Sequence, residues 1–167
     1  MKKGLLGMAV MGAAILLALV PPVVDRAEAG GPPDVVHVNG GGTGLFVEPS
    51  ITPTDQGLTT NFSVGAKIFE DGSASGHFVC LIPGVLVING QYTAGSFDTD
   101  TGVATLSGDA IIYFVGDEPI LVEFTNTFTD GGAGVGGFTL SETSGFFPNY
   151  PEDVDTELVI KGRINIQ

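Results

Sequence analysis

The sequence predicts an all-β protein, an antiparallel meander that is β-barrel-like, with a β-sandwich as the alternative. Apolar and polar residues alternate with a period of two in several stretches, as in strands with one buried face. Turn-forming pairs and glycine-rich segments separate these stretches at short intervals. No window shows the i, i+3, i+4, i+7 apolar spacing of a helix. Consecutive hairpins favour a meander, and closure into a barrel removes its edges.

The opening segment is typical of a cleaved bacterial signal peptide. Two lysines precede a long apolar run, and Ala27 and Ala29 then form the small-x-small pattern of a cleavage site. We expect cleavage before Gly30, so that residues 1–29 are the signal peptide and 30–167 form a single all-β domain. The mature chain has no second long apolar segment, so we expect no membrane span after cleavage. The expected location is secreted or periplasmic.

The expected strands follow the alternation, and some neighbours are expected to merge. They cover 35–39, 43–47, 58–70, 74–82, 84–89, 90–98, 102–108, 109–116, 120–129, 136–142 and 157–166. In the last of these strands the spacing predicts one face made of Leu158, Ile160, Ile164 and Ile166. The opposite face would carry Val159, Lys161, Arg163 and Asn165.

Turn chemistry separates these strands. Asp71-Gly72 suits a two-residue hairpin, because both residue types tolerate positive φ. Residues 98–102 (DTDTG) predict a hairpin loop with Gly102 in a left-handed conformation, and 116–119 predict another turn. Residues 129–137 form a glycine-rich connection, and 144–155 form a longer loop before the last strand.

Charge narrows the classes of partner. The chain is acidic, with a net charge of −13, and it is glycine-rich, with 26 glycines. The first 29 residues hold three bases and two acids, so the mature net charge is −14. Such a surface repels phosphate backbones and anionic membranes, so we expect no nucleic-acid partner. One cysteine allows no intramolecular disulfide.

His77 and Cys80 are the first candidates for chemistry. In a regular strand His77 lies on one face with Val79, and Cys80 lies on the other with Phe78. A nucleophile and its base must be within hydrogen-bond reach, so this pair does not form in a regular strand. We expect Cys80 to be a small core side chain, and His77 to be a surface or lumen residue.

Acidic residues offer a possible structural calcium site and no other cofactor. Asp98 and Asp100 lie two residues apart on a loop, as at the start of a calcium-binding loop. A second acidic cluster contains Glu152, Asp153, Asp155 and Glu157. The alternative for both groups is a set of solvated loop acids. The glycines of 39–44 (NGGGTG) lack the Lys and Ser/Thr of a phosphate-binding loop.

Several segments resemble a loose group of small secreted bacterial β-proteins. The likeness rests on GSASGHFVCLIPGV, on VEFTNTFTDGGAGVGGFTL and on the closing LVIKGRINI. The group shares a DGSxSGxF hairpin, a glycine-rich loop and a terminal GxIxI strand. These are turn and strand motifs, so the resemblance implies a shared fold and carries no activity or functional residue.

We therefore expect a non-catalytic secreted β-domain, a binding or envelope/extracellular interaction module. Its partner would be a small apolar ligand in the barrel lumen or a protein. Phe146, Phe147 and Tyr150 form an aromatic loop that is a candidate contact patch, although these rings could equally cap the core. Two alternatives remain: a small-molecule enzyme in the barrel lumen, and a structural surface or matrix component that assembles through the edge of the last strand.

Overall fold

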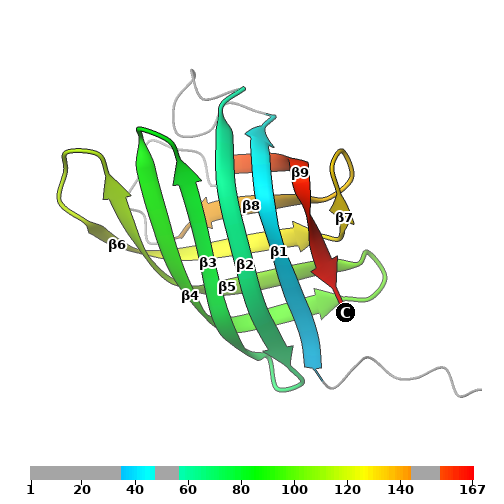
Figure 1. Ribbon diagram of the computed structural model, residues 1–167. Helices are drawn as coiled ribbons and strands as arrows, with labels where there is room; N and C mark the ends of the chain where they lie inside the picture. Colours follow the sequence, from blue (N-terminus) through cyan, green and yellow to red (C-terminus); the bar gives the residue numbers. More distant parts are fainter. Residues whose placement is uncertain (1–34, 48–56, 144–154) are drawn as a thin grey trace, which may run out of the picture. The chain divides into compact units, whose positions relative to one another are not determined.

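The computed structural model describes residues 35–47, 57–143 and 155–167, and nine strands account for most of them (Figure 1). No residue in these ranges is helical, so none forms a helix able to cross a bilayer. The strands are β1 Val35–Phe46, β2 Thr59–Phe69, β3 Ser73–Ile82, β4 Leu86–Asp98, β5 Val103–Phe114, β6 Ile120–Thr129, β7 Gly131–Gly132, β8 Gly137–Glu142 and β9 Asp155–Ile166.

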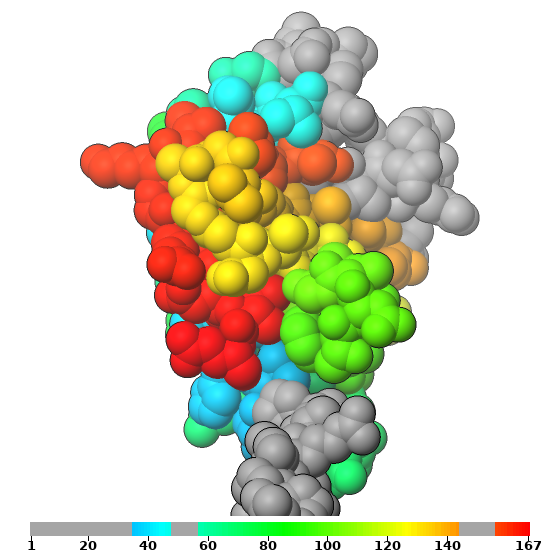
Figure 2. Space-filling view, turned by 90° about the vertical axis from the view of Figure 1, so that its right-hand side faces the viewer, coloured from blue at the N-terminus to red at the C-terminus, as the bar shows by residue number. Residues whose placement is uncertain are grey.

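Eight long strands close into an antiparallel barrel, which confirms the barrel over the sandwich. Each pairs with its neighbours in the order β1-β2-β3-β4-β5-β6-β8-β9, and β9 returns to pair with β1. In Figure 1, β1 to β4 lie in front, and β5, β6 and β8 cross behind them. The two-residue β7 pairs with the second half of β9, and Figure 2 shows this yellow segment against the red strand. Both sides of β9 are therefore hydrogen-bonded.

The turns predicted at Asp71-Gly72, 98–102 and 116–119 occur, but the first connection has three residues, 70–72, and not two. The loop predicted at 144–155 lies outside the described residues, apart from Asp155, which begins β9. Gly72 donates its N–H to Phe69, and Gly102 has the expected positive φ of 70°. Three pairs of expected strands merge into β1, β4 and β5. They merge because the glycines and polar residues between them continue the strand pairing and form no turns.

The predicted faces of the last strand are wrong in its first half. Val159 is fully buried and Ile160 is 42% exposed, the reverse of the simple alternation. The register of the pairing with β1 shifts between Thr43 and Gly44. Thr43 pairs with Lys161, and the next residue, Gly44, pairs with Val159. Ile160 is therefore the extra residue of a bulge, and a bulge exchanges the faces of the residues that precede it. Beyond the bulge, Ile164 points inward as predicted.

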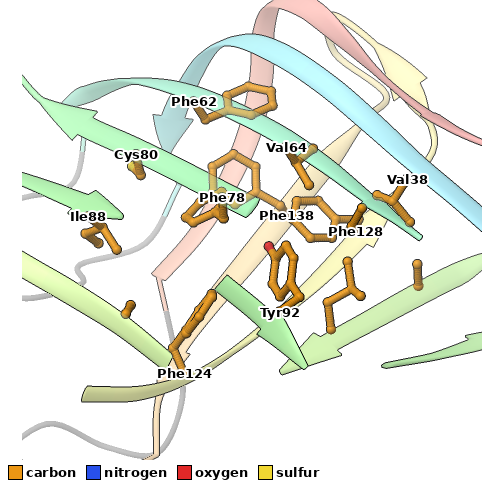
Figure 3. Close-up of a cluster of buried hydrophobic side chains, with 14 of the residues drawn as sticks. Val38, Phe62, Val64, Phe78, Cys80, Ile88, Tyr92, Phe124, Phe128 and Phe138 are labelled. Carbon is orange, nitrogen blue, oxygen red and sulfur yellow. The ribbon is translucent and has the colours of Figure 1, made fainter. Parts of the chain in front are cut away.

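Phenylalanine rings fill the middle of the barrel. Phe78 is fully buried, and its ring centroid lies 6.3, 6.2 and 5.7 Å from those of Phe124, Phe128 and Phe138 (Figure 3). The Phe124 ring lies so close to β4 that a Cβ at Gly90 would overlap it. Glycine at this strand position therefore makes room for the ring. The lumen at this level holds a packed aromatic core.

The seam between β1 and β9 depends on glycine. A Cβ at Gly42 would overlap the Lys161 carbonyl oxygen, and one at Gly162 would overlap the Gly41 carbonyl oxygen. At Gly40 the nearest atom, the Arg163 carbonyl oxygen, would be 2.8 Å from a Cβ. The two backbones thus approach more closely than side chains allow, and the run of glycines in β1 lets the barrel close.

Alanine at Gly162 should open this seam. Gly162→Ala is expected to cost more than 2 kcal/mol of unfolding free energy, because it combines positive φ with overlap against β1. Gly102→Ala is the matched control: its φ is also positive, but a Cβ there meets nothing within 4 Å. It should cost only the backbone strain of about 1 kcal/mol. Urea unfolding measures both, and equal losses would contradict a steric role for the seam.

Candidate functional site

His77 and Cys80 lie on opposite faces of β3, as predicted. His77 is exposed on the outer face, where it pairs with Gly65 of β2 and Gln91 of β4. Cys80 is 1% exposed and points into the barrel among the core side chains (Figure 3). The two side chains cannot act as a nucleophile–base pair, and Cys80 is the small core residue that the sequence predicts.

Asp98 uses its carboxylate to stabilise a turn. Its Oδ1 accepts hydrogen bonds from the N–H groups of Asp100 at 2.8 Å and Thr101 at 3.2 Å. Hydrogen bonds from the Thr101 side chain and from these two backbone groups hold the pKa of Asp98 below its ordinary value. In the part of the chain that the structure describes, no three His, Cys, Asp or Glu side chains form a metal-binding group. Calcium binding at this loop stays a prediction.

Other predicted sites lie wholly or partly outside the described residues. Asp155 begins β9, but its side chain is not described. Outside the described residues lie Phe146, Phe147, Tyr150, Glu152, Asp153 and the expected cleavage residues Ala27, Ala29 and Gly30. The acidic cluster and the aromatic contact patch therefore stay predictions.

Glu157, which the sequence placed among loop acids, is buried inside the barrel at 1% exposure. The Thr60 hydroxyl donates a hydrogen bond to its Oε2, and the Cys80 thiol lies 3.9 Å from its Oε1. A Cβ at Gly44 would overlap the same carboxylate, so the β1 glycine gives it room. The burial of Glu157 was not predicted because it depends on the bulge at Ile160. The bulge turns the Glu157 side chain inward together with that of Val159.

A second buried polar group spans the barrel from β4 to β8. The Tyr92 hydroxyl donates to Asn126 Oδ1 at 2.6 Å, and Asn126 Nδ2 donates to the Thr139 carbonyl oxygen at 2.8 Å. Burial raises the pKa of Tyr92 well above its ordinary value, because the ionised form would lose its hydration. Among the described residues, no buried side-chain nitrogen or oxygen lacks a hydrogen bond. These interior groups therefore satisfy one another, as structural polar pairs do.

The outer face carries an unexpected apolar surface where β3, β4, β5 and β6 meet their connecting turns. Val115 and Leu121 are 71% and 70% exposed, far more than the large apolar side chains of the core. We name this surface the apolar patch, and it consists of Val79, Leu81, Val85, Val87, Ile111, Tyr113, Val115 and Leu121. The β3–β4 and β5–β6 turns that border it lie beside each other at the upper left of Figure 1.

Strand pairing makes the apolar patch continuous. Val87 of β4 is the cross-strand partner of both Leu81 and Tyr113. In the next row, exposed Asn89 of β4 lies between Val79 and Ile111, and Ile111 pairs with Leu121 of β6. Directly opposed residues have Cβ atoms about 5 Å apart, so these side chains lie in contact range on the surface. The sequence contained the signal, because these apolar residues occupy positions where alternation predicts polar ones.

Carboxylates border the apolar patch on two sides. Asp109 and Glu123 face each other across β5 and β6, one row from Ile111 and Leu121. Asp117 and Glu118 are exposed on the turn between the same strands. The strong bases of the described residues lie elsewhere, on β2 and β9: they are Lys67, Lys161 and Arg163. The surface is thus apolar at its centre and negative at its border.

Comparison with protein-family models, with curated proteins and with solved structures finds no match for this chain. Function is therefore inferred from the residues themselves.

Removing the Thr60 hydroxyl should destabilise the barrel. Thr60→Val preserves shape but takes away one donor to a buried carboxylate, so we expect a loss of about 1–3 kcal/mol in unfolding free energy. Thr59→Val, on the exposed face of the same strand, should change stability by less than about 0.5 kcal/mol. Denaturant titration measures both. Equal effects would show that the Thr60–Glu157 hydrogen bond contributes nothing.

Tyr92 should make stability fall at alkaline pH. Above about pH 10 the tyrosine of the unfolded chain ionises while buried Tyr92 keeps its proton, so the unfolded state is favoured. The stability that this group contributes is complete below about pH 10 and is lost as pH rises beyond it. Unfolding free energies measured from about pH 9 to 11 should fall more steeply for the wild type than for Tyr92→Phe. Parallel pH profiles would contradict this assignment.

Proposed function

We propose that the chain is an exported, non-catalytic β-barrel module that binds a macromolecular partner through the apolar patch. The observation that carries the proposal is the continuous apolar surface on β3 to β6, at positions where most of the other strands present polar residues. An exposed apolar cluster with a polar border is typical of a protein-interaction site. Export to the periplasm or the medium is proposed from the signal-like residues 1–29.

The barrel interior favours this outer surface over a ligand in the lumen. Phe78 and the rings around it occupy the middle of the barrel. The buried polar groups make hydrogen bonds to one another, as Tyr92 does with Asn126 and Thr60 with Glu157. A small apolar ligand would have to displace this core. A partner on the outside needs no such rearrangement.

Assembly through the edge of the last strand finds no support in the pairing. β9 is hydrogen-bonded to β1 on one side and to β8 and β7 on the other. A strand with both sides occupied offers no row of free backbone groups to another chain. Contacts of this barrel with other molecules are therefore proposed to be made by side chains.

Serine substitutions in the apolar patch should abolish partner binding and leave the fold intact. A photo-crosslinking amino acid is placed at position 121 of the protein, in the cells that produce it. Illumination would then link the partner to the protein, and the identified partner is purified. The double variant Val115→Ser/Leu121→Ser should bind it at least tenfold more weakly than the wild type, because the most exposed apolar contacts are lost. Isothermal titration calorimetry gives the dissociation constants.

The matched control is Phe69→Ser/Ile160→Ser, which removes two exposed apolar side chains on β2 and β9, outside the apolar patch. Its affinity should stay within about twofold of the wild type, and neither double variant should change stability by more than about 1 kcal/mol. Equal weakening by both double variants would contradict the proposal. Crosslinking that is as strong from position 69 as from 121 would also contradict it.

A further inference from the structure

We propose that the partner docks on the apolar patch with a basic amphipathic helix, one whose apolar stripe is flanked by Lys or Arg. This inference rests on the proposed function and adds the chemistry of the partner. Three features support it: the pairing of the strands on both sides over most of the apolar patch, the width of the apolar patch and the sign of its border.

The closed pairing favours a helix over an extended segment. An extended chain gains affinity at a sheet by adding backbone hydrogen bonds along a free edge. Leu81, Val87 and Ile111 are paired with a strand on both sides, so most of the apolar patch offers no edge. Among the described residues, Tyr113 pairs with β4 alone and Leu121 with β5 alone. An extended chain laid across the apolar patch would lose water from its own backbone groups without replacement. A helix satisfies those groups internally and can bury an apolar face against side chains alone.

The width of the apolar patch matches a short helix. It crosses four neighbouring strands spaced about 4.8 Å apart, which makes it about 14 Å wide. A helix rises about 1.5 Å per residue, so about ten residues span that width. Ten residues place three or four apolar side chains on one face, at i, i+3, i+4 and i+7. The rows Leu81–Val87–Tyr113 and Ile111–Leu121 offer a comparable number of contacts.

The carboxylates at the border of the apolar patch favour a helix with basic residues on both sides of its apolar stripe. A docked helix would project one flank over Asp109 and Glu123 and the other towards Asp117 and Glu118. Basic side chains on both flanks would meet these carboxylates, while acidic side chains would be repelled.

The same border opposes a second copy of this chain. Because acids lie on two sides of the apolar patch and the net charge is −13, a second copy would bring carboxylates near carboxylates. An anionic lipid surface meets the same repulsion.

Two designed peptides test the inference on the purified protein. Both peptides form helices of about 18 residues, or five turns, and carry the same stripe of leucines. The residues that flank the stripe are Lys in the first peptide and Glu in the second. Fluorescence anisotropy at about 0.15 M salt gives the dissociation constants. We expect the Lys peptide to bind at least tenfold more tightly than the Glu peptide, and Val115→Ser/Leu121→Ser to weaken it at least tenfold.

Charge variants separate local recognition from attraction between net charges. Asp109→Asn/Glu123→Gln should weaken the Lys peptide at least fivefold. Glu70→Gln/Asp130→Asn removes the same charge from exposed turns at the other end of the strands, and it should change the dissociation constant by less than twofold. Equal weakening by the two charge variants would overturn the inference, because binding would then follow net charge alone.

Three further outcomes would overturn it, and they distinguish it from the proposed function. Equal, patch-dependent binding of both peptides would refute the basic flanks and leave the apolar patch as a binding site. Absence of patch-dependent binding by either peptide would refute the helix, and the crosslinked partner would then show independently whether the apolar patch binds anything. Concentration-dependent dimerisation that Val115→Ser/Leu121→Ser abolishes, seen by analytical ultracentrifugation, would assign the apolar patch to a second copy.

Discussion

The close approach of β1 and β9 is the constraint on which the rest of the barrel depends. A meander of eight long strands has two edges until its first and last strands pair, and here they pair over most of their length. Glycines 40, 42 and 162 leave no Cβ between the two backbones at the seam. The segment NGGGTG, which lacks the residues of a phosphate-binding loop, therefore has a structural explanation: it is the part of β1 that lies against β9.

Closure also determines how the polar groups inside the barrel must behave. Once the wall is complete, a buried hydroxyl or carboxyl has only other interior groups as partners, and an unsatisfied group would cost several kcal/mol. Glu157 lies beside the seam, where Gly44 leaves space for its carboxylate and Thr60 donates to it. Tyr92 and Asn126 pair deeper inside, next to the phenylalanine cluster. The seam and the interior hydrogen bonds thus depend on each other.

Much of the fold could be predicted because strand alternation and turn chemistry are local properties. Gly72 and Gly102 mark their turns through a tolerance of positive φ that needs no tertiary information. Phe78 and Cys80 point inward because a regular strand has a period of two. Merged strands such as β4 were harder to predict, because the glycines and polar residues inside them resemble turn signals until the pairing partner is known.

The inward side chain of Glu157 could not be predicted from the sequence, because a single extra residue changes the register of β9. The bulge at Ile160 depends on the pairing of β9 with β1, which are far apart in the sequence. From the sequence alone, in which the bulge is not visible, Glu157 resembles the other acidic residues of the preceding loop. The apolar patch was missed for a related reason: Leu121 and Ile111 each look like an isolated apolar residue on a polar face. Only the register of β5 and β6 shows that they are neighbours.

The barrel wall also separates stability from recognition. Inward residues such as Phe78 are committed to the core, and most of the described strand backbone is committed to neighbouring strands, so neither contributes much to the choice of a partner. Selectivity is left to outward side chains, and most of the strongly charged ones in this acidic chain are carboxylates. An apolar partner surface gains contact only if it also tolerates or neutralises the acids around the apolar patch. The sign of those acids would therefore exclude most surfaces that the apolar side chains alone would accept.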